Sequence, residues 1–217
     1  MALQRSAGAG PRGGPEDRGE AWGDFEHLIR QTHIFASVAR DILEVKYLDE
    51  VSPSPLTLPQ FHLLRLISVN GDHQVGEVAD FLGISGPAVT KNADKLERLG
   101  LVERKGVPGD RRGTVLCASP EGRRLVRRYE SVKQRRLTPV FEHFTRQDLE
   151  KLAKLMERFS LAVIEREDSG DGMCMRCAAY FEDACPVSRV RGDCAYQELR
   201  HGRHARRQAA AGGARGP

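Results

Sequence analysis

The 217-residue chain lacks several features, and each absence excludes a class of protein. No stretch approaches the roughly 18 consecutive apolar residues that a membrane span needs, so we expect no membrane partner. The first residues, MALQRSAGAGPRGGPEDRGE, lack the apolar segment of a secretory signal peptide, which indicates a cytoplasmic protein. Residues 1–20 and the basic tail at 201–217 are rich in Gly, Ala and Arg without periodicity, and we expect both to be disordered.

The usual sequence signatures of enzymes are also missing. The stretch GISGP departs from the Gly-x-Ser-x-Gly nucleophile elbow, because Pro87 takes the last position and no strand is predicted before it. The stretch GVPGDRRG lacks the Gly-Lys-Ser/Thr ending of a phosphate-binding loop. We therefore predict no catalytic residues and no enzymatic activity.

The net charge of +4 is small, but it is distributed unevenly. Residues 84–112 hold seven Lys or Arg against four Asp or Glu, and residues 186–217 hold seven against two. The rest of the chain is therefore net negative. Two basic segments suit a polyanionic partner, although solvated faces produce similar clusters.

Hydrophobic spacing predicts a mainly α-helical chain with one small β-hairpin. Apolar residues at spacings of mostly three or four make residues 24–50 one long amphipathic helix, which the following prolines end. Three short helices follow, and their expected apolar faces are Phe61, Leu64 and Ile67, then Val75, Val78, Ala79 and Leu82, then Val89, Ala93, Leu96 and Leu99. The stretch LVERKGVPGDRRGTVLCAS predicts two strands around a turn. Ser119 then opens a helix to about residue 144, and Thr145 caps another to about residue 166.

Two helices joined by the tight turn GIS and followed by a hairpin predict a winged helix-turn-helix. In such a unit the second helix enters the major groove, where its first residues meet the base edges. The candidate DNA-binding residues on this helix are Ser85, Gly86, Pro87, Ala88, Thr90, Lys91, Asn92 and Lys95. At the hairpin tip, Arg111 and Arg112 can reach a minor groove or neighbouring phosphates. A polar helix face alone is ordinarily just solvated, but a basic hairpin in register with it favours DNA binding.

These stretches resemble the MarR family of bacterial transcriptional regulators over roughly residues 25–166. The most specific part is the wing signature, which reads Asp110-Arg111-Arg112 and then Ser119-Pro120-Glu121-Gly122, with serine in place of the family's usual threonine. The resemblance implies a homodimer that binds a pseudo-palindromic operator in double-stranded DNA. Its DNA-binding part would span residues 56–118, between dimerisation helices at 24–50 and 120–166.

The resemblance also implies a small phenolic or lipophilic effector, held between the dimerisation and DNA-binding parts. No residue pattern in this chain names that effector. Cys117 lies in a strand where the family shows small or polar residues, and we expect this lone thiol to be inert.

Four cysteines follow the family-like part, inside a cysteine-rich module at residues 169–200: Cys174, Cys177, Cys185 and Cys194. In a reducing compartment such a cluster indicates a metal site or a redox sensor rather than structural disulfides. Four thiolates suit zinc, but the second Cys-x2-Cys that zinc sites usually show is missing. The Cys185-Pro186 pair resembles the end of ferredoxin ligand runs and slightly favours an iron-sulfur cluster. An iron-sulfur cluster, zinc and a metal-free redox pair all stay open.

The sequence thus predicts a sequence-specific DNA-binding regulator, a dimeric repressor, in which residues 21–168 form the winged-helix domain. The cysteine module would modulate or stabilise that domain. The alternative is a metal-binding interaction protein that uses the winged helix to dock other proteins, since a fold alone does not determine a function. The operator, the regulated genes, the effector and the metal cannot be read from these residues.

Overall fold

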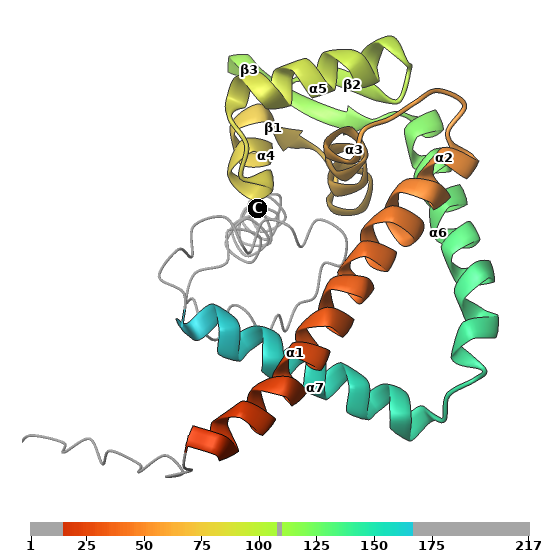
Figure 1. Cartoon of the computed structure of the whole chain (residues 1–217). Helices are drawn as coiled ribbons and strands as arrows, with labels where there is room; N and C mark the ends of the chain where they lie inside the picture. Colours follow the sequence, from red (N-terminus) through yellow and green to blue (C-terminus); the bar gives the residue numbers. More distant parts are fainter. Residues whose placement is uncertain (1–14, 108–109, 167–217) are drawn as a thin grey trace, which may run out of the picture. The chain divides into compact units, whose positions relative to one another are not determined.

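The structure is a computed structural model that describes residues 15–107 and 110–166. The chain divides into two compact units between Lys46 and Tyr47. The first unit is helical, with α1 at Pro15–Ser37 followed by a π-helical stretch, η1, at Val38–Lys46. The second unit holds, in chain order, α2 (Tyr47–Val51), α3 (Leu58–Asn70), β1 (His73–Gln74), α4 (Val75–Leu82), α5 (Gly86–Arg98), β2 (Val102–Val107), β3 (Asp110–Ala118), α6 (Pro120–Phe141) and α7 (Arg146–Arg166) (Figure 1).

The predicted fold class, mainly helical with a small sheet, is confirmed, and the helical elements appear in the predicted order. The sheet has three antiparallel strands in the order β1-β3-β2, although only β2 and β3 were predicted. Strand β1 has two residues, with His73 opposite Leu116 and Gln74 opposite Val115. Two residues are too few to show an alternating pattern, so the prediction missed this strand.

Helix α3 is the centre of the second unit. Phe61, Leu64 and Ile67 are buried as predicted, and Leu63 and Leu66 are fully buried as well. The helix is apolar on several sides because α4, α5, α6 and β3 all pack against it. On α6, the ring of Tyr129 lies 4.6 Å from the ring of Phe61, between centroids.

The apolar face predicted for α4 is partly wrong. The helix buries Val78 and Phe81, whereas Val75, Ala79 and Leu82 are only partly covered. Phe81 follows Val78 by three residues and therefore shares its face, while Val75 is the first residue of a helix of eight residues. The apolar stripe of α5 is confirmed for Val89, Ala93 and Leu96, each 0% exposed, but Leu99 falls at the helix end and is partly exposed.

The N-terminal helix begins earlier than predicted. Helix α1 starts at Pro15, inside the stretch that was expected to be disordered, and Pro-Glu-Asp is typical of a helix start. Helical structure continues to Val51, but the nine residues of η1 are π-helical rather than α-helical. The cysteine-rich module and the basic tail lie outside the described residues. Across the described helices, none is both long and apolar enough to cross a membrane.

Candidate nucleic-acid interface

Helix α5 begins directly after a tight turn. Gly83 has φ 63° and ψ 35°, a left-handed conformation that glycine adopts without strain, and its N–H donates to the carbonyl of Ala79 to end α4. Ser85 caps α5, because its hydroxyl accepts a hydrogen bond from the N–H of Ala88 at 3.4 Å. Pro87 lies in the first turn of the helix, where it removes no helical hydrogen bond. Ser85 therefore has a structural role at this end, whatever else it contacts.

The predicted polar recognition residues lie outside the buried stripe of α5. Thr90 and Lys91 are exposed, and Asn92 and Lys95 are partly exposed, while the buried stripe holds the opposite side. The Thr90 hydroxyl donates to the carbonyl of Gly86 at 3.1 Å, which leaves its methyl group and a lone pair for a partner. Asn92 keeps both an amide donor and a carbonyl acceptor for base edges.

The end of α5 is joined to the start of α6 by the Ser-x-x-Gly segment. The buried Ser119 hydroxyl donates to the carbonyl of Gly100 at 2.6 Å and accepts from the N–H of Gly122 at 3.0 Å. A Cβ atom at Gly122 would lie 2.2 Å from the carbonyl oxygen of Leu101 and 2.8 Å from the Leu64 side chain. This position therefore requires glycine, because α6 passes too close to the backbone after α5 for any side chain.

Strand β2 contacts the recognition helix through Arg104. Its guanidinium donates to the Asp94 carboxylate, with Nη2 and Oδ1 2.5 Å apart, and also to the Glu97 carboxylate. The hydrogen bond to Asp94, and then the charge of Glu97, raise the pKa of Arg104 above its ordinary value. Arg104 therefore stays charged at neutral pH, and α5 is held to the sheet by a forked ion pair.

The wing is formed by β2 and β3. These strands pair from Val102 opposite Ala118 to Gly106 opposite Thr114, with an irregularity between Gly106 and Val107. The backbone of Arg111 and Arg112 belongs to the first residues of β3, next to the tip rather than at it. The structure thus brings the backbone of these two residues onto the same hairpin whose other strand contacts α5.

Comparisons with known proteins agree with this arrangement. Residues 54–113 match the sequence model of the MarR family. The uncharacterised HTH-type transcriptional regulator YsmB of Bacillus subtilis is 29% identical over 126 residues, which cover 58% of this chain and 82% of that protein. Over its winged-helix part the chain is thus similar to MarR-family regulators.

Solved structures show the same fold at lower sequence identity. The crystal structure of RV1404 from Mycobacterium tuberculosis has a TM-score of 0.55 at 22% identity, covering 62% of this chain and 91% of that one. A MarR family protein from Bacillus stearothermophilus has a TM-score of 0.51 at 23% identity, covering 67% and 96%. These structures share the fold, and the sequence matches support a MarR-type DNA-binding transcriptional regulator.

Two contacts of this winged-helix domain were not predicted from the sequence. Arg104 was not among the candidate residues. Its contacts with Asp94 and Glu97 cross a helix end and a turn, and no sequence periodicity describes such a spacing. Ser119 was predicted as a helix cap, but its bond to Gly100 joins residues 19 apart in the chain. Neither contact could be predicted before the positions of the helices and strands were known.

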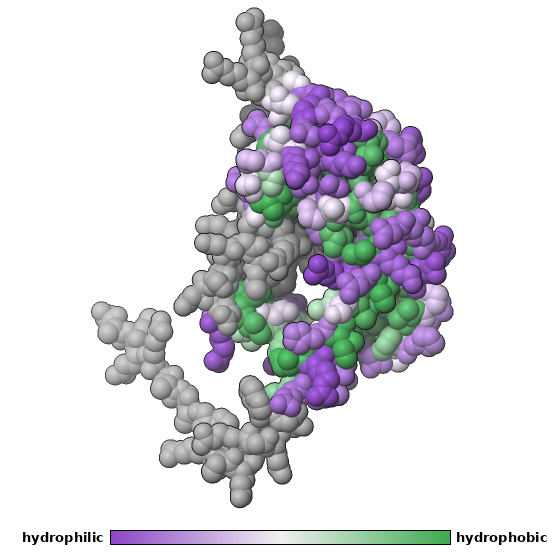
Figure 2. Space-filling view, turned by 45° about the horizontal axis from the view of Figure 1, so that its top comes forward, coloured by the Kyte–Doolittle hydropathy of each residue, from purple (hydrophilic) through white to green (hydrophobic). Residues whose placement is uncertain are grey.

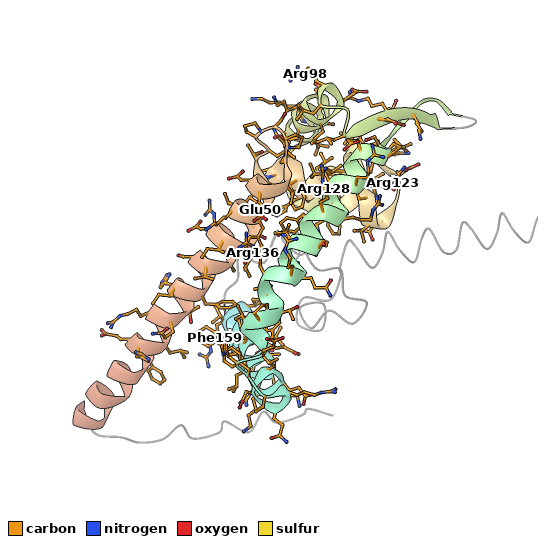
Figure 3. The ribbon with its side chains drawn as sticks, turned by 90° about the vertical axis from the view of Figure 1, so that its right-hand side faces the viewer. Glu50, Arg98, Arg123, Arg128, Arg136 and Phe159 are labelled. Atoms are coloured by element: carbon orange, nitrogen blue, oxygen red, sulfur yellow. The ribbon has the colours of Figure 1, made fainter. Side chains whose placement is uncertain are left out.

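Several arginines lie along helix α6. Figure 3 shows Arg98 at the end of α5 and Arg123, Arg128 and Arg136 along α6. Arg136 pairs with Glu50 of α2 at 3.0 Å, which connects α2 to α6. A groove of about 470 Å³ lies between α3 and α6, lined by Ser68, Val69, Arg123, Val126, Arg127, Glu130, Ser131 and Gln134.

Cys117 behaves as a buried structural thiol. It is 2% exposed in β3, and burial, with a hydrogen bond to Asp72, raises its pKa to about 11. A thiol with this pKa is protonated at neutral pH and reacts slowly. Cys174, Cys177, Cys185 and Cys194 lie outside the described residues, among which no group of three or more His, Cys, Asp and Glu could hold a metal ion.

Proposed function

We propose that this MarR protein is a homodimeric, sequence-specific repressor that reads a pseudo-palindromic duplex through α5. The observation that carries the proposal is that Thr90 and Lys91 are exposed and Asn92 is partly exposed, while a fully buried stripe faces the core. Base edges in the major groove need donors and acceptors of this kind on a helix that enters with its first turns.

Exposed apolar side chains support the homodimer. On α1 and η1, residues left between 36% and 52% exposed are Phe25, Leu28, Ile29, Ile34, Phe35, Val38, Ile42 and Val45. On α7, Leu155 is 58% exposed, and Leu152 and Val163 are also exposed; Figure 3 shows Phe159 on the same helix. Figure 2 shows apolar residues at the surface of the described chain, between polar ones. Burial of such residues against a second copy is the favourable contribution that a stable dimer needs.

A selection experiment tests sequence-specific binding. Duplexes enriched by the purified protein from a random library should share a pseudo-palindrome whose half-sites lie about 34 Å, one helical turn, apart. Affinity for the selected duplex should fall steeply as salt rises, because phosphate contacts release counterions. Replacement of Arg111 and Arg112 by Ala should flatten that slope by about one unit for each lost phosphate contact. The protein-docking alternative would be supported by two results together. The selected duplexes would share no sequence, and the protein would bind a partner protein at high salt.

We infer repression from the effect of a dimer bound at a promoter. A protein that occupies a site overlapping a promoter excludes the polymerase from it, so transcription in vitro from a template with the selected duplex at the promoter should decrease. A template with the site scrambled serves as the control. Increased transcription from the selected template would make the protein an activator.

We also propose that Cys174, Cys177, Cys185 and Cys194 hold an iron-sulfur cluster or zinc, with a slight preference for the cluster. The support is the sequence, in which four thiols fall within 21 residues in a basic setting that favours thiolates. Anaerobic purification, an absorption spectrum and metal analysis test this proposal. Replacement of any one of the four by Ser should remove most of the metal, while Cys117→Ser should remove none.

The groove beside α6 is the place that we propose for a small effector. It combines the apolar Val69 and Val126 with the donors of Arg123 and Arg127. Such a lining suits a phenol or an apolar molecule with a polar end, which is the class that the family resemblance implies. Chemical-shift changes at these four residues, on titration with a panel of phenols and phenolic acids, would test the location.

A further inference from the structure

Arg104 lies where the two DNA-reading elements of the fold meet. It belongs to β2, opposite Leu116 of the central strand, and its side chain is 28% exposed. Its guanidinium contacts Asp94 and Glu97, both on α5. Arg104 therefore connects the wing hairpin to α5 through two ion pairs.

The two carboxylates share a side of α5 with a recognition residue. Thr90, Asp94 and Glu97 follow one another at spacings of four and three, which places them along one flank of the helix. Thr90 is at the end of this flank that leads into the groove, and Glu97 is at the end near β2. The ion pairs of Arg104 with Asp94 and Glu97 therefore also determine the direction in which Thr90 faces.

The other contacts of α5 act mainly through apolar packing. The buried stripe of Val89, Ala93 and Leu96 sets which side of α5 faces the core, but the hydrophobic effect is not directional. The bond of Ser119 to Gly100 holds only the end of the helix. A planar guanidinium that binds two carboxylates one turn apart adds the missing directional constraint.

We propose that Arg104 is a positioning residue, which sets the angle of the recognition helix relative to the wing and so determines how well the protein distinguishes its operator from other DNA. The inference rests on the proposed sequence-specific binding. Arg104 acts through Asp94 and Glu97 and does not itself contact the DNA. Its partners carry two negative charges beside a surface that meets phosphates, and the ion pair also reduces their repulsion.

Variants with opposite changes of charge separate positioning from simple electrostatics. Arg104→Ala removes one positive charge, whereas Asp94→Asn with Glu97→Gln removes two negative charges, and both break the same fork. If Arg104 positions the helix, both variants should lose discrimination, by roughly tenfold each, which equals the loss of about one good base contact. Arg104→Lys should recover part of the loss, since an ammonium group can satisfy one carboxylate but not the fork.

The measurement is the ratio of affinities for two duplexes, over a series of salt concentrations. One is the duplex selected from a random library by the wild-type protein, and the other is the same duplex scrambled. We expect the ratio to fall in both fork variants while the salt slope on the scrambled duplex stays unchanged, because no phosphate contact is lost. A variant that combines the three substitutions should lose no more of the affinity ratio than either fork variant, because either variant alone already breaks the fork.

The control is Arg146→Ala, which breaks an exposed pair with Glu150 on α7 and should leave the ratio unchanged. Thermal unfolding of every variant verifies that each is folded at the temperature of the binding measurements. Opposite effects of the two fork variants, or a salt slope reduced by one unit in Arg104→Ala alone, would mean that Arg104 contacts phosphate and overturn the inference. A wild-type ratio near one would refute sequence-specific binding, and the inference with it. A normal ratio in Arg104→Ala would refute the inference alone.

Discussion

Helices α3 and α7 are both rich in leucine, yet one lies inside the molecule and the other is largely exposed. On α3, Leu63 is 0% exposed, because helices and a strand cover the helix from several sides. On α7, Leu155 is 58% exposed. The same side chain thus stabilises the folded chain in one place and, in our proposal, only the assembly of two chains in the other. The comparison teaches that the apolar face of α3 is covered within one copy, whereas the exposed apolar face of α7 is the one for which we propose a partner.

The largest expected effect comes from a pair of matched truncations. Leu63→Ala should lower the free energy of unfolding by about 2 to 5 kcal/mol, because it leaves a cavity in a closed core. Leu155→Ala should leave the stability of the monomer almost unchanged and weaken the dimer instead. Chemical denaturation and analytical ultracentrifugation measure the two quantities. If Leu155→Ala destabilised the chain at concentrations where it is monomeric, α7 would be buried within one copy.

A second pair compares two glycines of the winged lobe. Gly122→Ala should destabilise the lobe by about 1 to 3 kcal/mol or more, because the added Cβ atom would meet backbone that cannot move aside. Gly76→Ala on α4 meets nothing within 4 Å and should stabilise the protein by about 0.5 to 1 kcal/mol. Thermal unfolding of both variants tests this difference. Equal effects would show that α6 does not approach Leu101 so closely.

A third prediction concerns the outward side of α5. Asn92→Ala should reduce affinity for the selected duplex by about 1 to 3 kcal/mol and leave the scrambled duplex unaffected. Thr90→Ala should have a smaller effect, because the Thr90 hydroxyl already donates to the carbonyl of Gly86. Fluorescence anisotropy with both duplexes measures each change. Equal losses on the two duplexes would show that this helix contacts the backbone but does not read bases.

The smallest expected effect concerns Cys117. Its folded pKa of about 11 lies above the ordinary value of 9.0, so the folded state keeps a proton that the unfolded state releases. The contribution of Cys117 to stability is therefore unchanged below about pH 9, and it declines as pH rises from 9 towards 11. Cys117→Ala should lose less stability over this interval than the wild-type protein, as urea unfolding at several pH values would show. Iodoacetamide at pH 7 should alkylate Cys117 only after denaturation.

Much of the fold could be predicted because its signals are local. The turn GIS, the cap at Ser85 and the apolar spacing of α5 act within a few residues of one another, and each was confirmed. The errors fell where neighbours in space decide the outcome. Phe81 rather than Leu82 enters the core, since the direction in which the core lies cannot be read from eight residues.

The sequence by itself determined most of the helices, the hairpin, the polar face of α5 and the resemblance to the MarR family, because spacing, caps and turn residues are properties of short segments. Only the tertiary structure decided that Arg104 holds α5, that Ser119 bonds Gly100, and that Gly122 must lack a side chain. These contacts join residues 7 to 58 positions apart, and their geometry depends on how helices and strands pack. Short-range periodicity carries no information about such distances, because it describes one element at a time and the packing angle between two elements is a property of both.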